Sequence, residues 1–200
     1  MRKIDTIDGL EALYGPAASR SLTKVMPHIT PLYRRWIEAS RFCVLTSVGP
    51  GGTDGSPRGD DGPVAEVADE RTILMPDWRG NNRLDTLRNI VADGRLSLMF
   101  MVPGSTNVVR VNGTAYLTDD AEARARFAKG DAQPTTVIVT GVAEVYFQCA
   151  KAVMRAGLWD RDDAHLVPSA GDFVKEAASG DFDARAYDAD YPAYAAERMW

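Results

Sequence analysis

The segment Met75–Ile90, MPDWRGNNRLDTLRNI, decides how this sequence is interpreted. A β-rich run, Thr72–Met75, leads into it, and the polar residues of Pro76–Asn82 then form a predicted loop. The spacing of the apolar residues after this loop predicts an amphipathic helix over Arg83–Val91. The apolar face of that helix is expected to consist of Leu84, Leu87, Ile90 and Val91.

The entrance to this predicted helix is a candidate anion-binding site. A helix N-terminus presents unpaired N–H groups and a partial positive charge, and both favour a phosphate. Asn81 and Asn82 add amide donors, and Arg83 adds a guanidinium fork. The alternative is a plain polar loop in which Asn82 caps the helix. The two arginines Arg79 and Arg83, with Gly80 between them, favour the anion site.

The segments around this one predict a mainly β fold with peripheral helices (α+β). The first 40 residues are expected to be helical, with Thr30 as an N-cap and Pro31 at the first helical position. Further strands are predicted over Phe42–Val48, Ser56–Asp60, Val64–Ala68, Leu96–Val102, Val108–Leu117 and Thr135–Phe147, and further helices over Asp119–Lys129 and Cys149–Ala156. Hairpin-like links between strands favour an antiparallel barrel, and the lack of a G-x-G-x-x-G pattern argues against a doubly wound sheet.

We expect one domain over residues 1–200. Residues 1–40 would form a helical N-terminal extension, residues 41–147 the barrel, and residues 148–200 a helical C-terminal segment. A chain of 200 residues fits this size, and 45% hydrophobic with 26% charged residues exclude a disordered or collagen-like chain.

Charge and residue counts exclude several functions. With 23 Lys and Arg against 28 Asp and Glu, the chain lacks the basic excess of a general nucleic-acid binder. Two cysteines, Cys43 and Cys149, and two histidines, His28 and His165, leave little material for a zinc site or a hydrolase triad. The N-terminus lacks a signal-peptide pattern, and no apolar run approaches the roughly 18 residues of a membrane span. We therefore expect a cytoplasmic protein without a metal.

Four motifs in order resemble a known family. They are Ser56–Asp60 (SPRGD), Pro76–Asn89 (PDWRGNNRLDTLRN), Val109–Gly113 (VRVNG) and Cys149–Trp159 (CAKAVMRAGLW). Together they resemble the pyridoxamine 5′-phosphate oxidase-like FMN-binding split-barrel superfamily, and more narrowly a bacterial branch of little-characterised flavoproteins. Each motif alone is weak evidence for the family. Four motifs in the right order over residues 42–159 argue against a chance resemblance.

The resemblance implies a split antiparallel β-barrel that binds FMN between the two subunits of a homodimer. It implies that the phosphate is held by Arg58 and by Asn81, Asn82 and Arg83. It implies further that Pro76 and Asp77 lie along the isoalloxazine and ribityl groups, and that the partner subunit contributes Val108, Arg110 and the C-terminal segment. The expected cofactor-binding residues are Arg58, Asp60, Pro76, Asp77, Arg79, Asn81, Asn82, Arg83, Val108, Arg110, Lys151, Arg155 and Trp159.

Three departures from the oxidase pattern exclude pyridoxamine phosphate as the substrate. The oxidase has a lysine a few residues after the early-strand arginine, where this chain has Asp60-Asp61-Gly62-Pro63. Its flavin-contacting glutamine aligns with Val108. Its C-terminal substrate signature, which contains R-x-H-D-R, is missing from a chain that ends AAERMW.

Several of these residues also have simpler roles. Arg58 would form a surface ion pair with Asp60 or Asp61, or Asp60 would orient Arg58 toward a phosphate. Arg110 would face solvent or a dimer interface, since Val109 and Val111 point to the opposite side of the strand.

The C-terminal motif leaves two alternatives open. Lys151 and Arg155 share one helix face at i, i+4 and would form, with Trp159, a basic aromatic edge of the partner's cofactor cleft. Alternatively, Val153 and Met154 pack inward while the two cations meet water. Both cysteines are expected to be small buried hydrophobic residues.

The leading hypothesis is an FMN-dependent oxidoreductase that passes a hydride to or from a small organic substrate. A flavin carries its own redox centre, so the protein has only to bind, orient and tune it, and no catalytic side chain is assigned. NAD(P)H would serve as a transient donor. The alternatives are a flavin-binding carrier or sensor without turnover, and the same fold binding deazaflavin or haem, although neither histidine stands in a recognisable haem-ligand context.

Overall fold

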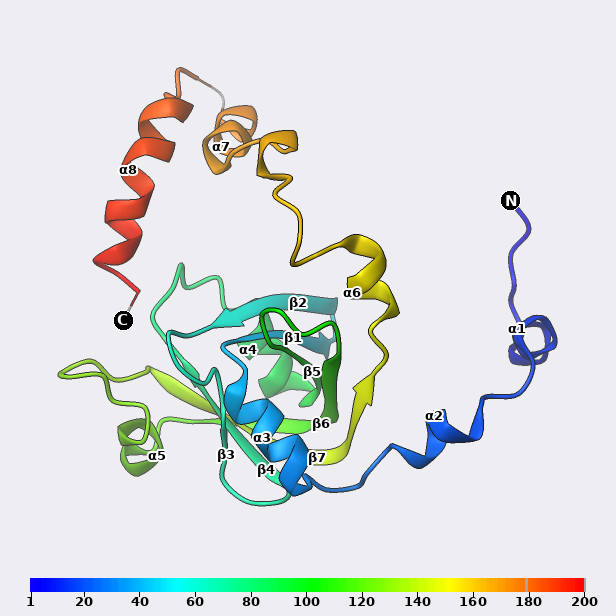
Figure 1. Cartoon of the computed structure of the whole chain (residues 1–200). Helices are drawn as coiled ribbons and strands as arrows, with labels where there is room; N and C mark the ends of the chain where they lie inside the picture. Colours follow the sequence, from blue (N-terminus) through cyan, green and yellow to red (C-terminus); the bar gives the residue numbers. More distant parts are fainter. Residues whose placement is uncertain (179, 200) are drawn as a thin grey trace.

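The central feature of the computed structural model is one seven-stranded antiparallel sheet that closes on itself as a barrel (Figure 1). The structure describes residues 1–178 and 180–199. Along the sheet the strand order is β2-β1-β5-β6-β7-β4-β3. The strands are β1 (Phe42–Gly49), β2 (Gly52–Gly59), β3 (Glu66–Val67), β4 (Thr72–Asp77), β5 (Arg95–Met101), β6 (Val108–Thr118) and β7 (Thr136–Gln148).

The barrel interior is filled by alternate residues of its strands. In β5 the side chains of Leu96, Leu98 and Phe100 are buried, and the residues between them are less so. Facing strands contribute Leu45, Ile73, Val111, Ile138 and Val145. Each large apolar side chain that is fully buried contributes roughly 1.5–3 kcal/mol, so this alternation holds the barrel together.

One irregularity in the sheet lies where β6 crosses β7. The pairing shifts between Asn112, opposite Glu144, and Gly113, opposite Val142, so that one residue of β7 is left over. A Cβ atom on Gly113 would stand 2.0 Å from the carbonyl oxygen of Gly141, so only glycine permits this close approach. The sheet therefore has a bulge in β7 close to Gly141.

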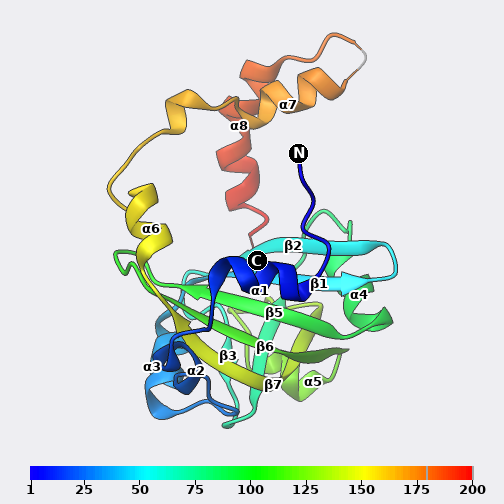
Figure 2. The same ribbon diagram turned by 90° about the vertical axis from the view of Figure 1, so that its right-hand side faces the viewer.

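The helices lie around the barrel and beyond it (Figures 1 and 2). Helix α3 (Pro31–Ala39) packs against β3 and β6 through Ile37, and α4 (Asp85–Ala92) packs against β1, β2 and β6 through Ile90. The others are α1 (Ile7–Tyr14), α2 (Ser19–Thr23), α5 (Ala121–Ala125), α6 (Lys151–Ala156), α7 (Ala170–Ala177) and α8 (Ala184–Ala196), with a 3-10 turn η1 (Ala164–Leu166).

The predicted strands are confirmed, with some changes in length. The short polar piece expected over Ser56–Asp60 is the second half of β2, which pairs with β1 from Gly52 onward because the tight turn at residues 50–51 starts a hairpin. Strand β4 continues through Asp77, so the loop after it is shorter than expected.

Three helix predictions were wrong in part. Leu84 and Val91 are 44% and 75% exposed, so the apolar face of α4 is narrower than its spacing indicated. The helix expected over Asp119–Lys129 is reduced to α5, which Asp120 caps by accepting from the N–H groups of Glu122 and Ala123. Thr30 precedes α3 without a side-chain cap hydrogen bond.

The division into residues 1–40, 41–147 and 148–200 stays a prediction. Residues 179 and 200, which belong to the predicted C-terminal segment, lie outside the described residues. Within the described part of the chain, no helix is long and apolar enough to cross a membrane.

Candidate functional site

A pocket of about 650 Å³ lies between β2, the loop from β4 to α4, and the start of β7. It brings together six of the predicted cofactor-binding residues, namely Arg58, Asp77, Arg79, Asn81, Asn82 and Arg83. A smaller cavity of about 170 Å³ adjoins it and is lined by two more, Asp60 and Pro76. Arg58 and Trp78 line both spaces. The predicted loop is thus one wall of the larger pocket.

Arg58 is the best-shielded cation of this pocket. Its Nη1 donates to Oδ1 of Asp77, the last residue of β4, and the two side chains are only 19% and 13% exposed. The alternative of an ion pair with Asp60 or Asp61 is contradicted, because Arg58 pairs with Asp77 at the end of β4. Among the described residues the Nε atom of Arg58 has no hydrogen-bond partner although it is buried. One donor of this guanidinium is therefore available to a ligand.

Asp60 has a different partner from the one expected. The Nζ of Lys129, from the loop after α5, donates to Oδ1 of Asp60 at 2.5 Å and also to Asp61. Burial lowers the pKa of the Lys129 ammonium, but the hydrogen bonds to the two carboxylates outweigh it, and the pKa is raised. Lys129 also lies 5.8 Å from the ring centre of Trp78. Asp60 therefore anchors Lys129 beside the smaller cavity and does not orient Arg58.

The loop before α4 corrects two expectations. The helix begins at Asp85, with Leu84 at the N-cap in the left-handed region (φ 62°), so Arg83 lies before the first turn and not within it. Asn82 also has a positive φ of 58° and does not cap the helix. Arg83 is 79% exposed in its side chain and pairs with Asp85. Arg83 therefore lies between two residues with left-handed backbone, outside the helix.

Electrostatically, the pocket is balanced. Three arginines, Arg58, Arg79 and Arg83, face three carboxylates, Asp54, Asp77 and Asp85. Two of the arginines are paired as described, and Asp54 accepts from the Oγ1 of Thr86. Within the chain itself, the pocket walls carry no net charge.

Sequence reasoning missed several lining residues. Trp78 stood inside the quoted segment, where an aromatic residue flanked by a carboxylate and an arginine could have marked it. Thr136 lies far from that segment in the sequence, and no pattern around it indicates a binding residue. Its Oγ1 is buried without a hydrogen-bond partner among the described residues, so it is a second polar atom available to a ligand.

Five predicted residues do not line this pocket. On the outward face of the sheet, Arg110 is half-buried between Met99 and Tyr146 of the neighbouring strands, with its guanidinium carbon 5.4 Å from the Tyr146 ring centre. Val108 is buried in a small cluster with Met101 and the α6 residue Val153.

The α6 segment matches its predictions in part. Lys151 and Arg155 are exposed, and Val153 is buried as the alternative expected, but Met154 is 64% exposed and does not pack inward. The Nε1 of Trp159 donates to the carbonyl oxygen of Ser105 at 2.7 Å, which ties the end of this segment to the β5–β6 loop. Within the described chain, these basic side chains lie apart from the pocket.

The two cysteines differ from each other. Cys43 is fully buried in β1 as expected, and burial raises the pKa of its thiol to about 12. Cys149 is exposed just before α6, so the expectation that it is buried was wrong.

Comparison with known proteins identifies the family. The family model described as pyridoxamine 5′-phosphate oxidase matches residues 29–149, more than half of the chain. The chain therefore belongs to the pyridoxamine 5′-phosphate oxidase family, and the resemblance drawn from its motifs is confirmed. A search of curated proteins found no match.

Three solved structures are similar to this chain. A HupZ variant from Group A Streptococcus is 19% identical with a TM-score of 0.50, and the match covers 60% of this chain and 99% of that one. HupZ from the same organism is 20% identical with a TM-score of 0.49, covering 58% and 91%. An FMN-binding protein from Syntrophomonas wolfei is 12% identical with a TM-score of 0.44, covering 72% and 97%. The split barrel is thereby confirmed as the fold.

Proposed function

We propose that this protein is an FMN-dependent oxidoreductase that works as a homodimer in the cytoplasm on a small organic substrate. The observation that carries the proposal is the shielded guanidinium of Arg58 in the wall of a large pocket, where its Nε has no hydrogen-bond partner among the described residues. Membership of the pyridoxamine 5′-phosphate oxidase family supports a flavin as the ligand.

The residues present fit such a cofactor. A volume of about 650 Å³ lies within the range of roughly 300–1,000 Å³ that small-molecule and cofactor sites occupy. Arg58 supplies a charged donor, Asn81 and Asn82 supply amide donors, and Thr136 supplies a buried hydroxyl. These groups would hold the phosphate and ribityl chain, with Pro76 and Asp77 beside the ring.

The balanced charge of the pocket supports a two-chain site. A phosphate that carries close to two negative charges would bind in a pocket whose lining residues have no net charge. Additional cations are therefore needed, and Lys151, Arg155 and Arg110 are basic residues that do not line the pocket of their own chain. A second copy that brings these groups to the pocket would complete the site.

When bound, FMN would supply the electron and hydride chemistry. The side chains of this protein would bind and orient the cofactor, and Trp78, which lines both spaces, would border the region left for the substrate. NAD(P)H is the proposed transient donor. No residue of the chain is assigned a proton-transfer role.

The identity of the ligand tests the proposal first. The purified protein should release FMN on heating, identified by its mass, and release of deazaflavin or haem would refute it. Anaerobic reduction by NADH or NADPH followed by reoxidation with candidate acceptors tests turnover. A flavin that no nicotinamide reduces and that shows no preference among acceptors would favour a carrier.

The need for two chains is tested by sedimentation with detection at the flavin absorbance. The flavin should sediment with a species of twice the chain mass of 21.8 kDa. A monomer that still binds FMN tightly would refute the two-chain site, and apo protein run at the same concentration is the control.

A further inference from the structure

Lys129 reaches the smaller cavity from a tight turn after α5. Its N–H donates to the carbonyl oxygen of Ala132 at 2.9 Å, and the N–H of Ala132 donates back to the carbonyl oxygen of Lys129 at 3.1 Å. Gly130 inside this turn has a φ of 59°, a conformation that glycine adopts without a steric cost. The turn therefore fixes the backbone from which the side chain of Lys129 extends.

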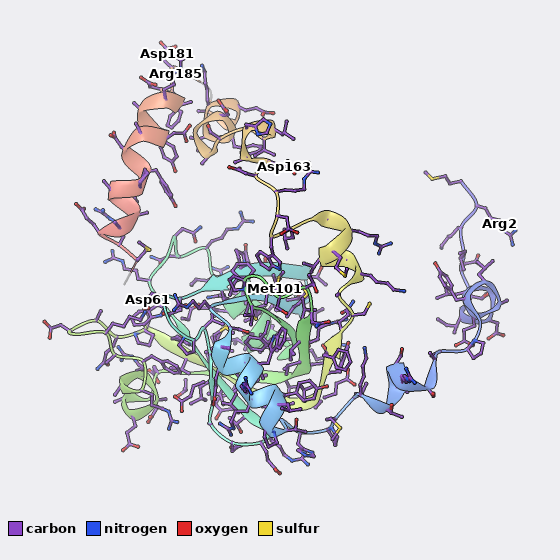
Figure 3. The ribbon with its side chains drawn as sticks, in the orientation of Figure 1. Arg2, Asp61, Met101, Asp163, Asp181 and Arg185 are labelled. Atoms are coloured by element: carbon purple, nitrogen blue, oxygen red, sulfur yellow. The ribbon has the colours of Figure 1, made fainter. Side chains whose placement is uncertain are left out.

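Two carboxylates hold the ammonium of Lys129 beside the wall of the smaller cavity. Its Nζ donates to Oδ1 of Asp60 at 2.5 Å and also to Asp61, and it lies 5.8 Å from the ring centre of Trp78. Asp60 and Trp78 both line that cavity. Figures 1 and 3 show Asp61 on the side of the barrel where α5 lies. The side chains of Lys129 and Asp60 are only 27% and 7% exposed, so solvent screens this pair of charges only in part.

The smaller cavity and the larger pocket differ in polarity. Four of the seven residues that line the smaller cavity are apolar or aromatic, namely Pro57, Val64, Pro76 and Trp78. The larger pocket is lined mainly by polar and charged residues, many of them from the loop between β4 and α4. Polar donors suit a phosphate, and apolar walls suit a flat ring system. In the proposed complex, one edge of the flavin ring therefore belongs in the smaller cavity.

The charge around the smaller cavity depends on Lys129. Arg58 and Asp60 line the cavity, and their ion-pair partners Asp77, Lys129 and Asp61 extend the cluster to two cations and three carboxylates. The net charge of this cluster is therefore −1 with the ammonium and would be −2 without it. A ring whose own charge changes on reduction is sensitive to such a difference.

We propose that Lys129 makes the bound flavin easier to reduce, by holding a positive charge beside the ring at the smaller cavity. This inference rests on the proposed function, because it needs FMN as the ligand. A hydride from NAD(P)H carries two electrons and one proton, so the ring that accepts it gains one negative charge. The ammonium of Lys129 favours that charge, whereas the carboxylate of Asp60 disfavours it.

The expected effect follows from Coulomb's law. At an effective dielectric constant of about 20, removing a unit charge at roughly 10 Å changes an equilibrium between two charge states by about tenfold. For a two-electron reduction, a tenfold change in the equilibrium constant corresponds to about 30 mV in the midpoint potential.

Midpoint potentials of the FMN-loaded proteins test the inference. They are measured by anaerobic reduction with dithionite in the presence of a reference dye. Lys129→Met should lower the potential by the amount of a tenfold change, because the ring then faces only the carboxylates. Asp60→Asn should raise it, because the ammonium stays while one negative charge is lost. Lys129→Arg keeps the cation and should change the equilibrium constant by less than twofold.

The opposite signs separate a charge effect from a general loosening of the site, which would shift both variants the same way. Lys3→Met is the matched control and should leave the potential unchanged, since Lys3 is exposed and its neighbour Arg2 lies far from Asp61 in Figure 3. If Lys129→Met does not retain FMN, Lys129→Gln, which keeps a hydrogen-bond donor, gives the same comparison.

Two results would overturn the inference. One is a native-like potential in FMN-loaded Lys129→Met or Lys129→Gln, and the other is a shift of Lys129→Met and Asp60→Asn in the same direction. Either result would leave the proposed function intact, because FMN would still be bound. A native protein that takes up no FMN on reconstitution would refute the proposed function, and this inference with it.

Discussion

Replacing Arg58 by methionine separates a phosphate ligand from a structural arginine. The substitution keeps an unbranched apolar stem beside Pro57 and removes the guanidinium that lines both cavities. A hydrogen bond to a charged group contributes roughly 1.5–3 kcal/mol, which corresponds to a loss of about tenfold to 150-fold in FMN affinity. Because the Arg58 side chain is only 19% exposed, solvent cannot replace it fully, and the upper half of this range is expected.

The same change also leaves Asp77 without its partner. The Asp77 side chain is only 13% exposed, so removing the guanidinium that pairs with it should lower the free energy of unfolding by about 1–3 kcal/mol. Urea unfolding of the apo protein measures this cost separately. The double variant Arg58→Met with Asp77→Asn should recover part of the stability without recovering FMN affinity.

Titration of both FMN and riboflavin into the two apo proteins gives the decisive comparison. Riboflavin lacks the phosphate, so its affinity should fall by less than threefold while that of FMN falls by at least tenfold. Arg88→Met, at an exposed position of α4 outside the pocket, is the control and should change neither affinity. Equal losses for FMN and riboflavin in Arg58→Met would refute the assignment of Arg58 to the phosphate.

Other residues give smaller or different effects. Arg83→Ala should weaken FMN binding by only about threefold in the same titration, because an exposed and already paired arginine contributes roughly 1 kcal/mol or less; a loss above thirtyfold would contradict this. Lys129→Met leaves Asp60, whose side chain is 7% exposed, without its ammonium, and should cost about 1–3 kcal/mol of stability at pH 7. The pKa of Lys129 in the folded state is raised above its usual value of 10.5, so its stabilising effect is complete below pH 10.5 and is lost as the pH rises through the folded-state pKa. Urea unfolding from pH 7 to 11 should therefore show the two free energies of unfolding, of the variant and of the native chain, approaching each other. A constant difference between these free energies would argue against the ion pair. A thiol reagent at pH 8 should modify the exposed Cys149 rapidly and Cys43 only on unfolding, since burial raises the pKa of the Cys43 thiol to about 12. Mass spectrometry that finds both cysteines modified in the native protein would contradict the burial of Cys43.

The candidate site was predictable where it is local in sequence. Asp77, Arg79, Asn81 and Asn82 stand within a few residues of one another after a strand, so a polar loop at the end of that strand has to bring them together. The start of α4 was not predictable with the same accuracy, since it depends on the left-handed backbone at Leu84, a conformation that leucine rarely adopts.

By itself, the sequence determined the class of fold and the place of the pocket loop. Apolar alternation, glycine turns and hairpin-length links act over a few residues, and they are enough to predict where the strands lie along the chain and that neighbours are antiparallel. The tertiary structure alone decided which charges meet. Arg58 and Asp77 are 19 residues apart and Lys129 and Asp60 are 69 apart, and only closure of the barrel, with β4 carried round beside β7, brings such residues within hydrogen-bond distance. Composition fixes how many charges a chain carries, but their pairing follows from strand order and register, which no local pattern encodes.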